Sequence, residues 1–394
     1  MPSISNSTTA IVCRLLLAVL SSVLVFATLI AQLPGNAWWI RIFDFPRIQI
    51  AVLIVVTLAG YGWLYFQSGL RLSGYMLAGA LALALGLQLY FIAPYTPLYP
   101  TQMQESLAEN DDNRVSLLIF NVLHDNREVE ALRRLIRSTN PDVILLSEPT
   151  HWWLEQLEGL EADYPHTLFA PQENKYGMLL YSRFELIDPE IRFLVQSKIP
   201  SFRVKLQLRS GQEITLYGVH PRPPGLKREA SEAGSTNPQN ASHGDDENEK
   251  TQAGEREDSD VRDAELQLVA KEVAKNTNKP VIVGGDFNDV AWSHSTGLFQ
   301  RIGGFIDPRI GRGLYNSFNA KNPIMRYPLD HVFASGHFRF VELRRLPAIG
   351  SDHFPMLVVL DFDPSALVQS EELERDAGDE EESEEAIEEG TDKG

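Results

Sequence analysis

Three long apolar runs occupy the first hundred residues, and they limit the fold of this chain more than any other feature. The runs cover residues 15–33, 48–66 and 72–93 and are nearly free of charge. Each has about the twenty residues that a helix needs to cross the hydrocarbon core of a bilayer. Buried helices of a soluble domain would explain one such run but not three in succession. The sequence therefore predicts a membrane domain with three transmembrane helices over residues 1–100.

The first run has an alternative interpretation as a cleaved signal peptide, because Arg14 precedes it and small residues follow it. It is longer than a usual signal core and lacks a clear cleavage site. The positive-inside rule does not decide the orientation, since Arg14 and Arg71 lie at one end of the predicted bundle and Arg41 and Arg47 at the other. An inside N-terminus with three spans, or a cleaved signal with two, places the C-terminal domain outside the cytoplasm. We predict that location.

The net charge of -18 belongs to two polar tracts. Residues 371–394 contain thirteen acidic and two basic residues, and residues 227–260 contain ten acidic and four basic residues. Together they carry -17, so the rest of the chain is nearly neutral. Segments of this composition bury too little apolar surface to offset the entropy lost on ordering. We therefore predict a disordered insertion at 225–260 and a disordered acidic tail at 364–394.

Residues 114–363 follow a predicted linker at 101–113 and have the pattern of an α/β domain. Short apolar runs alternate with helical or turn segments, which is typical of this class. Segments 127–140 and 261–276 have apolar residues at helical spacing. Strands are predicted at 115–122, 142–149, 177–183, 203–208, 214–220, 280–288, 329–335 and 356–362.

Polar residues recur where these apolar runs begin or end. They are Asn121, Glu148, His220, Asp286, Asn288, Asp330, Asp352 and His353. Ligands gather at strand ends in α/β folds, because the sheet holds the loop residues rigidly. Each residue alone has an ordinary explanation, such as a turn at 286–289 or a solvated loop at Glu148. Their occurrence together predicts a functional site.

The chemistry of this set points to a phosphate ester. Oxygen ligands such as Glu148, Asp352 and the amide of Asn121 suit Mg²⁺ or Mn²⁺ better than zinc. Asp286 is then placed to orient or deprotonate a water, and Asn288 to donate to a phosphoryl oxygen.

A histidine backed by a carboxylate is favoured in its protonated form and can stabilise charge on a phosphate under attack. His353 with Asp330 fits this role. The inferred reaction is metal-assisted attack of water on a phosphate ester. The glycine pair Gly284 and Gly285 is predicted to let the phosphate approach the backbone.

The motifs resemble, in order, those of the endonuclease/exonuclease/phosphatase superfamily. They are FNV at 120–122, SEP at 147–149, GMLLYSR at 177–183, GVHPRPP at 218–224, GGDFND at 284–289, LDHVFAS at 329–335 and SDHFPMLV at 351–358. GDFN with a later SDH is the specific pair. The match covers residues 115–362, and with the three apolar runs the chain resembles the bacterial membrane-attached branch, which implies a bacterial cell membrane as its location.

The resemblance implies a four-layer sandwich of two mixed β-sheets flanked by helices. It also implies roles for the polar residues: Asn121 and Glu148 at the metal, Asp286 with the attacking water, Asn288 on the phosphate, His353 paired to Asp330, Asp352 at the metal or phosphate, and His220 against the phosphate or leaving group. Some nucleases of the superfamily have an acidic residue where this chain has Leu123. Weaker metal binding is expected on that side.

The substrate stays open between two classes. A nucleic acid is the first candidate, although nucleases usually present a basic face and this core is nearly neutral. The alternative is a phospholipid or sphingolipid headgroup, with Trp152 and Trp153 either at the bilayer interface or covering the edge of the sandwich. A non-catalytic membrane scaffold is disfavoured, because every expected catalytic position is filled. The sequence carries no signature of a protein partner.

Overall fold

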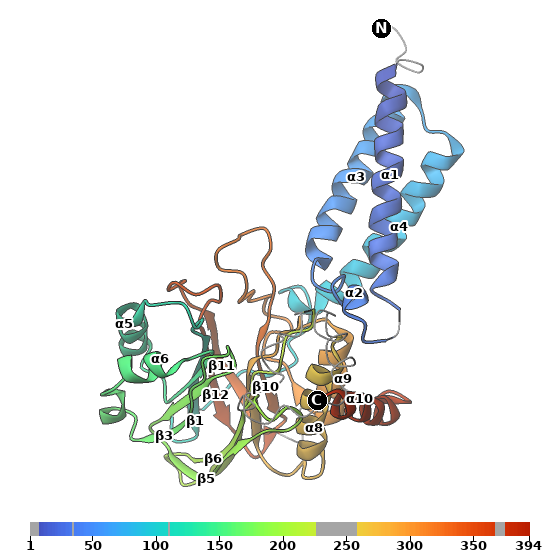
Figure 1. The fold of residues 1–394 in the computed structure, drawn as a ribbon. Coiled ribbons are helices and arrows are strands. Elements are labelled where there is room, and N and C mark those ends of the chain that lie inside the picture. Colours follow the sequence, from blue (N-terminus) through green and yellow to red (C-terminus); the bar gives the residue numbers. More distant parts are fainter. Residues whose placement is uncertain (1–7, 34, 109–110, 226–257, 367–374) are drawn as a thin grey trace, which may run out of the picture.

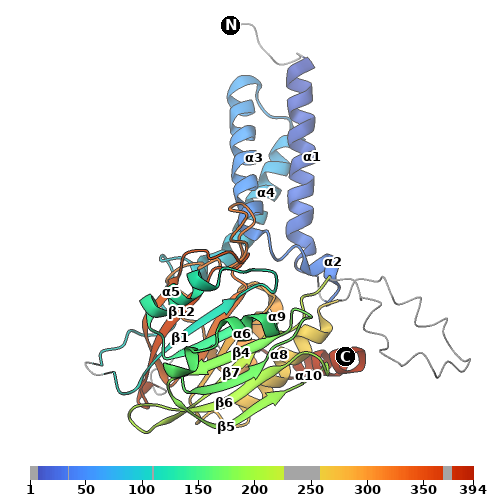
Figure 2. The same ribbon diagram turned by 60° about the vertical axis from the view of Figure 1, so that its left-hand side comes forward.

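A bundle of long helices stands on an α/β domain, and the chain runs from the bundle into the domain after Ile92 (Figure 1, Figure 2). This computed structural model describes residues 8–33, 35–108, 111–225, 258–366 and 375–394. Nearly all of the predicted insertion, residues 226–257, lies outside the described residues.

The bundle consists of α1 (Thr8–Ile30), α3 (Arg47–Ser68) and α4 (Leu72–Ile92), with the short α2 (Trp38–Arg41) between the first two. The three long helices are apolar enough to cross a membrane, over Ile11–Ile30, Arg47–Gln67 and Leu72–Tyr95. Large apolar side chains face outward: Leu16 is 64% exposed, Phe66 85% and Leu83 79%. Contiguous apolar surface of this kind is unfavourable in water and suits contact with lipid. The prediction of three long apolar helices is confirmed.

The α/β domain contains two mixed six-stranded sheets. The strand order is β11-β12-β1-β2-β4-β3 in the first sheet and β5-β6-β7-β8-β10-β9 in the second. The strands are β1 (Arg114–Asn121), β2 (Val143–Ser147), β3 (His166–Ala170), β4 (Met178–Ser182), β5 (Glu185–Arg192), β6 (Ser201–Gln207), β7 (Glu213–Val219), β8 (Val281–Asp286), β9 (Phe305–Ile306), β10 (Asp330–Ser335), β11 (Phe338–Arg345) and β12 (Met356–Phe362). The helices are α5 (Val129–Thr139), α6 (His151–Gln156), α8 (Asp260–Ala274), α9 (His294–Gly303) and α10 (Asp379–Lys393), with short 3₁₀ helices η2 (Ala93–Tyr95) and η3 (Leu160–Ala162).

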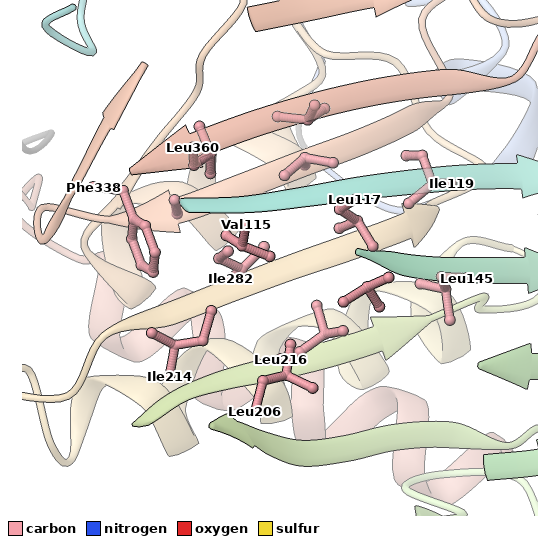
Figure 3. Close-up of a cluster of buried hydrophobic side chains, with 14 of the residues drawn as sticks. Val115, Leu117, Ile119, Leu145, Leu206, Ile214, Leu216, Ile282, Phe338 and Leu360 are labelled. Carbon is pink, nitrogen blue, oxygen red and sulfur yellow. The ribbon is translucent and has the colours of Figure 1, made fainter. Parts of the chain in front are cut away.

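The main apolar core lies between the two sheets, where Leu117 and Ile119 of β1 meet Leu216 of β7 and Ile282 of β8 (Figure 3). Helices α5 and α6 cover the outer face of the first sheet, and α8 and α9 cover that of the second. Central strands buried on both faces appear in a sequence as continuous apolar runs. The predicted four-layer sandwich of two mixed sheets flanked by helices is confirmed.

All eight predicted strands form, and the four that the sequence did not reveal, β3, β5, β9 and β11, are the edge strands of the two sheets. Edge strands tolerate exposure and charge, as in ELIDPEIR of β5, and β9 has only two residues, so none of the four gives a long apolar run. The predicted linker partly covers one of these edges. The amide of Phe340 in β11 donates to the carbonyl of Gln104 (2.8 Å), and the amide of Ser106 donates to the carbonyl of Phe340 (2.7 Å).

The prediction of a disordered tail is wrong for residues 379–393, which form α10 and pack along α8. Basic side chains of the domain pair with the acidic helix: Arg301 Nε lies 2.7 Å from Asp379 Oδ2, and Lys271 Nζ lies 2.9 Å from Glu380 Oε1. These pairs supply a partner surface that composition alone does not reveal. Because α8 lies between the sheet and α10, even its polar residue Gln267 is buried.

The glycine pair at the end of β8 serves close packing. A Cβ on Gly284 would lie 3.4 Å from a methyl carbon of Leu117, in the core between the sheets. Gly285 has φ +144°, and a Cβ there would lie 1.9 Å from the carbonyl oxygen of Val219 on β7. The glycines make room for the protein's own core and backbone, so the prediction that they admit a phosphate is wrong.

Replacing Gly285 with alanine is expected to destabilise the domain by about 3 kcal/mol, since the new methyl group meets backbone and the φ angle is strained. Gly297→Ala in α9 is the matched control, because its nearest neighbour is the flexible end of Arg301 at 3.3 Å. That variant should stay within about 1 kcal/mol of wild type. Denaturant unfolding of the detergent-solubilised protein, followed by tryptophan fluorescence, measures both. Equal stability of the two variants would contradict this packing.

Candidate active site

The two sheets bring the predicted polar residues to one end of the sandwich. Parallel pairing of β1 with β2 sets Asn121 opposite Ser147, so Glu148 follows directly at the same end. Antiparallel pairing of β8 with β10 sets Asp286 opposite Asp330. Each sheet therefore contributes one pair of polar residues, and the packing of β1 against β8 joins the pairs.

The amide of Asn121 connects the two sheets. Its Nδ2 donates to Oε1 of Glu148 at 2.9 Å and to Oδ2 of Asp286 at 3.0 Å. Its Oδ1 accepts from the amide of Leu123 at 3.0 Å. An asparagine at this position thus satisfies two carboxylates that would otherwise repel each other.

The backbone is strained at three positions beside these residues. Leu123 has φ 60°, Glu148 has φ 63° and Asn288 has φ 52°, which is the left-handed region that non-glycine residues rarely adopt. Such strain persists where surrounding contacts fix the loop, and it gathers at functional sites. The amide of Glu148 donates to the carbonyl of Gly177 at 2.9 Å, which anchors one of these turns.

His353 lies between two carboxylates. Its Nδ1 is 2.7 Å from Oδ2 of Asp330, and its Nε2 is 3.5 Å from Oδ2 of Asp286. Burial by itself lowers the pKa of His353, but the charges of Asp330 and Asp286 and the hydrogen bond to Asp330 outweigh it and raise the pKa to about 10. The ring is therefore an imidazolium at neutral pH.

Two serines position this pair, and sequence reasoning did not single them out. Ser351 Oγ donates to the carbonyl of Asn121 (2.7 Å) and accepts from the amide of His353 (3.0 Å). Ser317 Oγ accepts from the amide of Asp330 at 2.9 Å. Ser351 belongs to the SDH motif, so its position was available in the sequence, whereas the loop that carries Ser317 has no such motif.

His220 and Asn288 complete the surroundings of Asp286. His220 is buried, and its Nε2 lies 3.7 Å from Oδ2 of Asp286. The amide N–H of Asn288 donates to Oδ1 of Asp286 at 3.0 Å, and its side-chain Nδ2 donates to the carbonyl of Pro221 at 3.0 Å. One of the two amide hydrogens of Asn288 thus fixes the side chain to the loop after β7.

The remaining residues divide between the two sides of the site. Glu148 also contacts His124, whose Nδ1 lies 3.4 Å from Oε2 and which was not among the predicted site residues. Asp352 contacts Ser351 and adds to the raised pKa of His353. Asp286, Asp330 and His353 have ligand atoms within 4.8 Å of one another, close enough to hold a metal ion.

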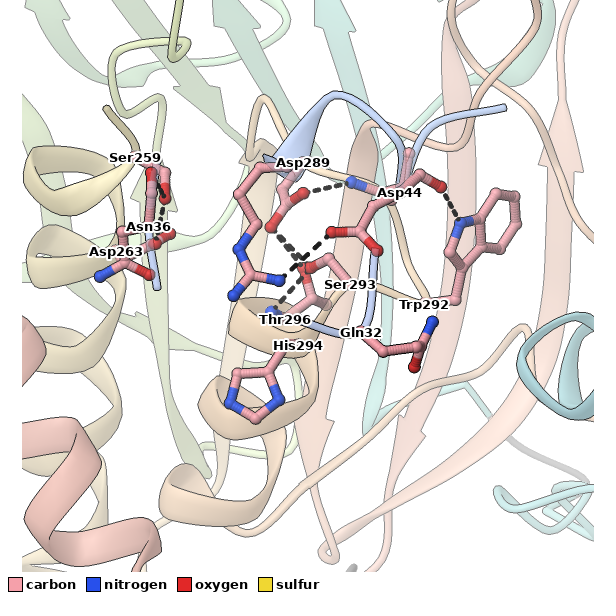
Figure 4. A network of polar contacts seen from close by, with 12 residues as sticks. Gln32, Asn36, Asp44, Ser259, Asp263, Asp289, Trp292, Ser293, His294 and Thr296 are labelled. Carbon is pink, nitrogen blue, oxygen red and sulfur yellow. Dashed lines mark hydrogen bonds and ion pairs between the residues drawn. The ribbon is translucent and has the colours of Figure 1, made fainter. Parts of the chain in front are cut away.

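The segment after Asn288 joins the site to the helical bundle. Arg262 of α8 donates from Nη1 to the carbonyl of Asn288 (3.1 Å), and its Nη2 lies 3.1 Å from Oδ2 of Asp289. The indole of Trp292 donates to the carbonyl of Asp44, just before α3, at 2.7 Å (Figure 4). Burial raises the pKa of Asp289 to about 6 although the charge of Arg262 lowers it. The loop that follows the Asp286 strand is therefore fixed from α8 and from the bundle.

Two such sheets with these polar residues at one end agree with the fold of a phosphoesterase. The family model described as "Endonuclease/Exonuclease/phosphatase family" matches residues 118–353. The chain belongs to this family.

Solved structures of similar fold differ strongly in sequence. A zebrafish (D. rerio) TDP2 complexed with a single-strand DNA product has 15% identity and a TM-score of 0.46, covering 64% of this chain and 100% of its own. An endonuclease/exonuclease/phosphatase from Bacteroides vulgatus has 14% identity and a TM-score of 0.46, covering 64% and 99%. The human Nocturnin catalytic domain with bound sulfate has 15% identity and a TM-score of 0.43, covering 64% and 95%. No curated protein matches the chain significantly in sequence.

The titration of His353 tests this geometry. Its folded pKa of about 10 lies above the ordinary value of 6.5, so its protonation stabilises the fold fully below pH 6.5, and this contribution is lost as the pH rises to about 10. Asp330→Asn removes one carboxylate and should lower the pKa of His353. NMR of histidine-labelled protein measures both, with His353→Gln to assign the signal. An unchanged titration in Asp330→Asn would show that Asp330 does not control the charge of His353.

Proposed function

We propose that the chain is a membrane-anchored, divalent-metal-dependent phosphoesterase in which a water attacks a phosphodiester. The observation that carries this proposal is the buried carboxylate of Asp286, which touches Asn121, His353 and His220 at once. A carboxylate held in a fixed orientation this way can position and deprotonate a water.

A divalent cation fits the side of the site that carries Glu148. The ligands there are the carboxylates of Glu148 and Asp286, hard oxygen donors that suit Mg²⁺ or Mn²⁺. Asn121 would ligate through Oδ1, which accepts from the amide of Leu123 in this structure, so its amide group would have to turn to bind the ion. The side chain of Glu148 is 15% exposed, so an ion can reach it from solvent. Such an ion supplies positive charge against the phosphate oxygens. His353 is a weaker ligand candidate, because both ring nitrogens face carboxylates.

Each residue of the site then has a separate role in the proposed reaction. Asp286 holds the attacking water and accepts its proton. The imidazolium of His353, kept charged by Asp330, stabilises negative charge that grows on the phosphate. Asn288 and His220 flank Asp286 and are placed to donate to a phosphoryl or leaving-group oxygen. Asp352 reinforces the charge of His353, and we keep the metal as an alternative role for it.

The bundle supports anchoring in a membrane with the catalytic domain outside the cytoplasm. The N-terminal end of α1 and the catalytic domain lie at opposite ends of the bundle (Figure 1). Arg41 and Arg47 at the catalytic end both pair with Asp44, at 3.5 and 2.5 Å, so they have a structural role there. Arg14 and Arg71 lie at the other end, and we propose that this end lies in the cytoplasm.

Asp286→Ala and His353→Ala should each lower hydrolysis of a soluble chromogenic phosphodiester by at least about a hundredfold. Chelation with EDTA should abolish wild-type activity, and Mg²⁺ or Mn²⁺ should restore it. Asp188→Ala and His151→Ala are matched controls, because both side chains are 65% exposed and lie outside the site. Unfolding curves verify that all variants are folded. Activity of the Asp286 variant equal to that of the controls would refute the assignment.

Topology has its own test. A reporter enzyme that is active only outside the cytoplasm, fused at the C-terminus, should be active in the full chain. The same reporter fused in the loop between α3 and α4, after Gly69, should be inactive. The reverse pattern would place the catalytic domain in the cytoplasm.

A further inference from the structure

A hairpin at residues 318–327 extends from beside His353 towards the helical bundle. At its base Phe318 pairs with Tyr327 and also with His353, and the rings of Phe318 and His353 lie 5.0 Å apart. The amide of Phe354 donates to the carbonyl of Ser317 at 2.7 Å. The base of this hairpin is therefore part of the wall around His353.

The tip of the hairpin reaches the start of a membrane span. Nε2 of Gln49 in α3 donates to the carbonyl of Ile324 at 2.7 Å, and the apolar span of α3 begins at Arg47. The hairpin rises beside the lower part of α3 in both views (Figure 1, Figure 2). Ile324 is 74% exposed and Met325 43% exposed. An exposed apolar tip at the level where a span begins lies where the bilayer interface would be.

Two arginines lie beside Phe354, the residue that follows His353. Arg326 and Arg345 both face the ring of Phe354, at 5.0 and 4.4 Å from its centroid. In the described part of the chain neither forms an ion pair with a carboxylate. Cations without carboxylate partners beside an apolar tip are the combination by which proteins bind anionic membrane surfaces.

We propose that the tip of the 318–327 hairpin enters the bilayer interface, that Arg326 and Arg345 bind the anionic part of a lipid headgroup, and that the hydrolysed phosphoester belongs to a bilayer lipid. This inference rests on the proposed phosphoesterase function and membrane anchoring. A long nucleic acid would have to run along a negatively charged membrane surface to reach the same site. The alternative that Trp153 lies at the bilayer interface is wrong, because this side chain is fully buried (0% exposed).

Fluorescent labelling tests the surface without relying on catalysis. Cys13 is the only cysteine, so Cys13→Ser gives a background in which Ile324→Cys carries one environment-sensitive dye. Phe193→Cys is the matched control, an apolar residue exposed to 49% just after β5. In phosphatidylcholine/phosphatidylglycerol vesicles the dye at position 324 should shift to the blue and be quenched at least about twofold by acyl-brominated lipid. The dye at position 193 should show neither effect. Equal behaviour of both dyes overturns the membrane contact.

Hydrolysis assays test the substrate class. The full-length protein receives three substrates in parallel: the soluble phosphodiester, those phospholipid vesicles and plasmid DNA. We expect release of a phosphorylated headgroup, and the double variant Ile324→Asp/Arg326→Gln should lower the ratio of vesicle to soluble-ester rates about tenfold. Phe193→Asp should leave that ratio unchanged. Cleavage of DNA or soluble ester without lipid cleavage overturns this inference alone, whereas a wild type inactive on all three substrates overturns the proposed function itself.

Discussion

The buried carboxylate of Asp286 is the constraint on which the rest of the site depends. It is 1% exposed, and an unpaired carboxylate at that depth would cost several kcal/mol. Its partners come from both sheets: the amide of Asn121 on β1, the backbone of Asn288 after β8, and two histidines that follow β7 and precede β12. The carboxylate is therefore stabilised only when the sandwich is assembled. Stability of the fold and geometry of the site depend on the same contacts.

The same dependence extends to the helical bundle. The loop after β8 contains Val290 and Trp292. These two residues pack in one apolar cluster with Phe45, Ile48 and Phe91 of the bundle. Arg262 fixes the intervening turn through Asn288 and Asp289, and a buried arginine with two carboxylate partners is costly to disrupt. The helical bundle therefore supports the loop after β8 directly.

Sequence reasoning succeeded where burial leaves a pattern along the chain. Central strands are buried on both faces, so all eight were predictable, whereas the four edge strands carry no such run. Asn121, Asp286, Asp330 and His353 were found because each ends or begins a central strand, and the structure brings them together. The sequence paired His353 with Asp330 but did not reveal that Asp286 lies on the other side of the imidazole, because that depends on register between strands far apart in sequence.

The predictions for the glycine pair and the acidic tail were wrong for the same physical reason. Each segment contacts residues from a distant part of the chain. The glycine pair meets Leu117 and Val219 from other strands, and the acidic tail folds because Lys271 and Arg301 supply opposite charge. Composition describes a segment alone and so overestimates its disorder when a partner lies in the same chain.

The position of the site relative to the bundle follows from the chain path. Only a few residues separate Asp286 from Trp292, and Trp292 is hydrogen-bonded to the backbone just before α3. A segment this short cannot let the catalytic end of the sandwich turn away from the bundle, and the contact of Gln49 with the hairpin fixes a second point. Two attachments on either side of Asp286 and His353 hold the active site towards the end of the bundle where its apolar spans begin. A ligand of this candidate site must therefore approach it beside the end of the bundle where α3 begins.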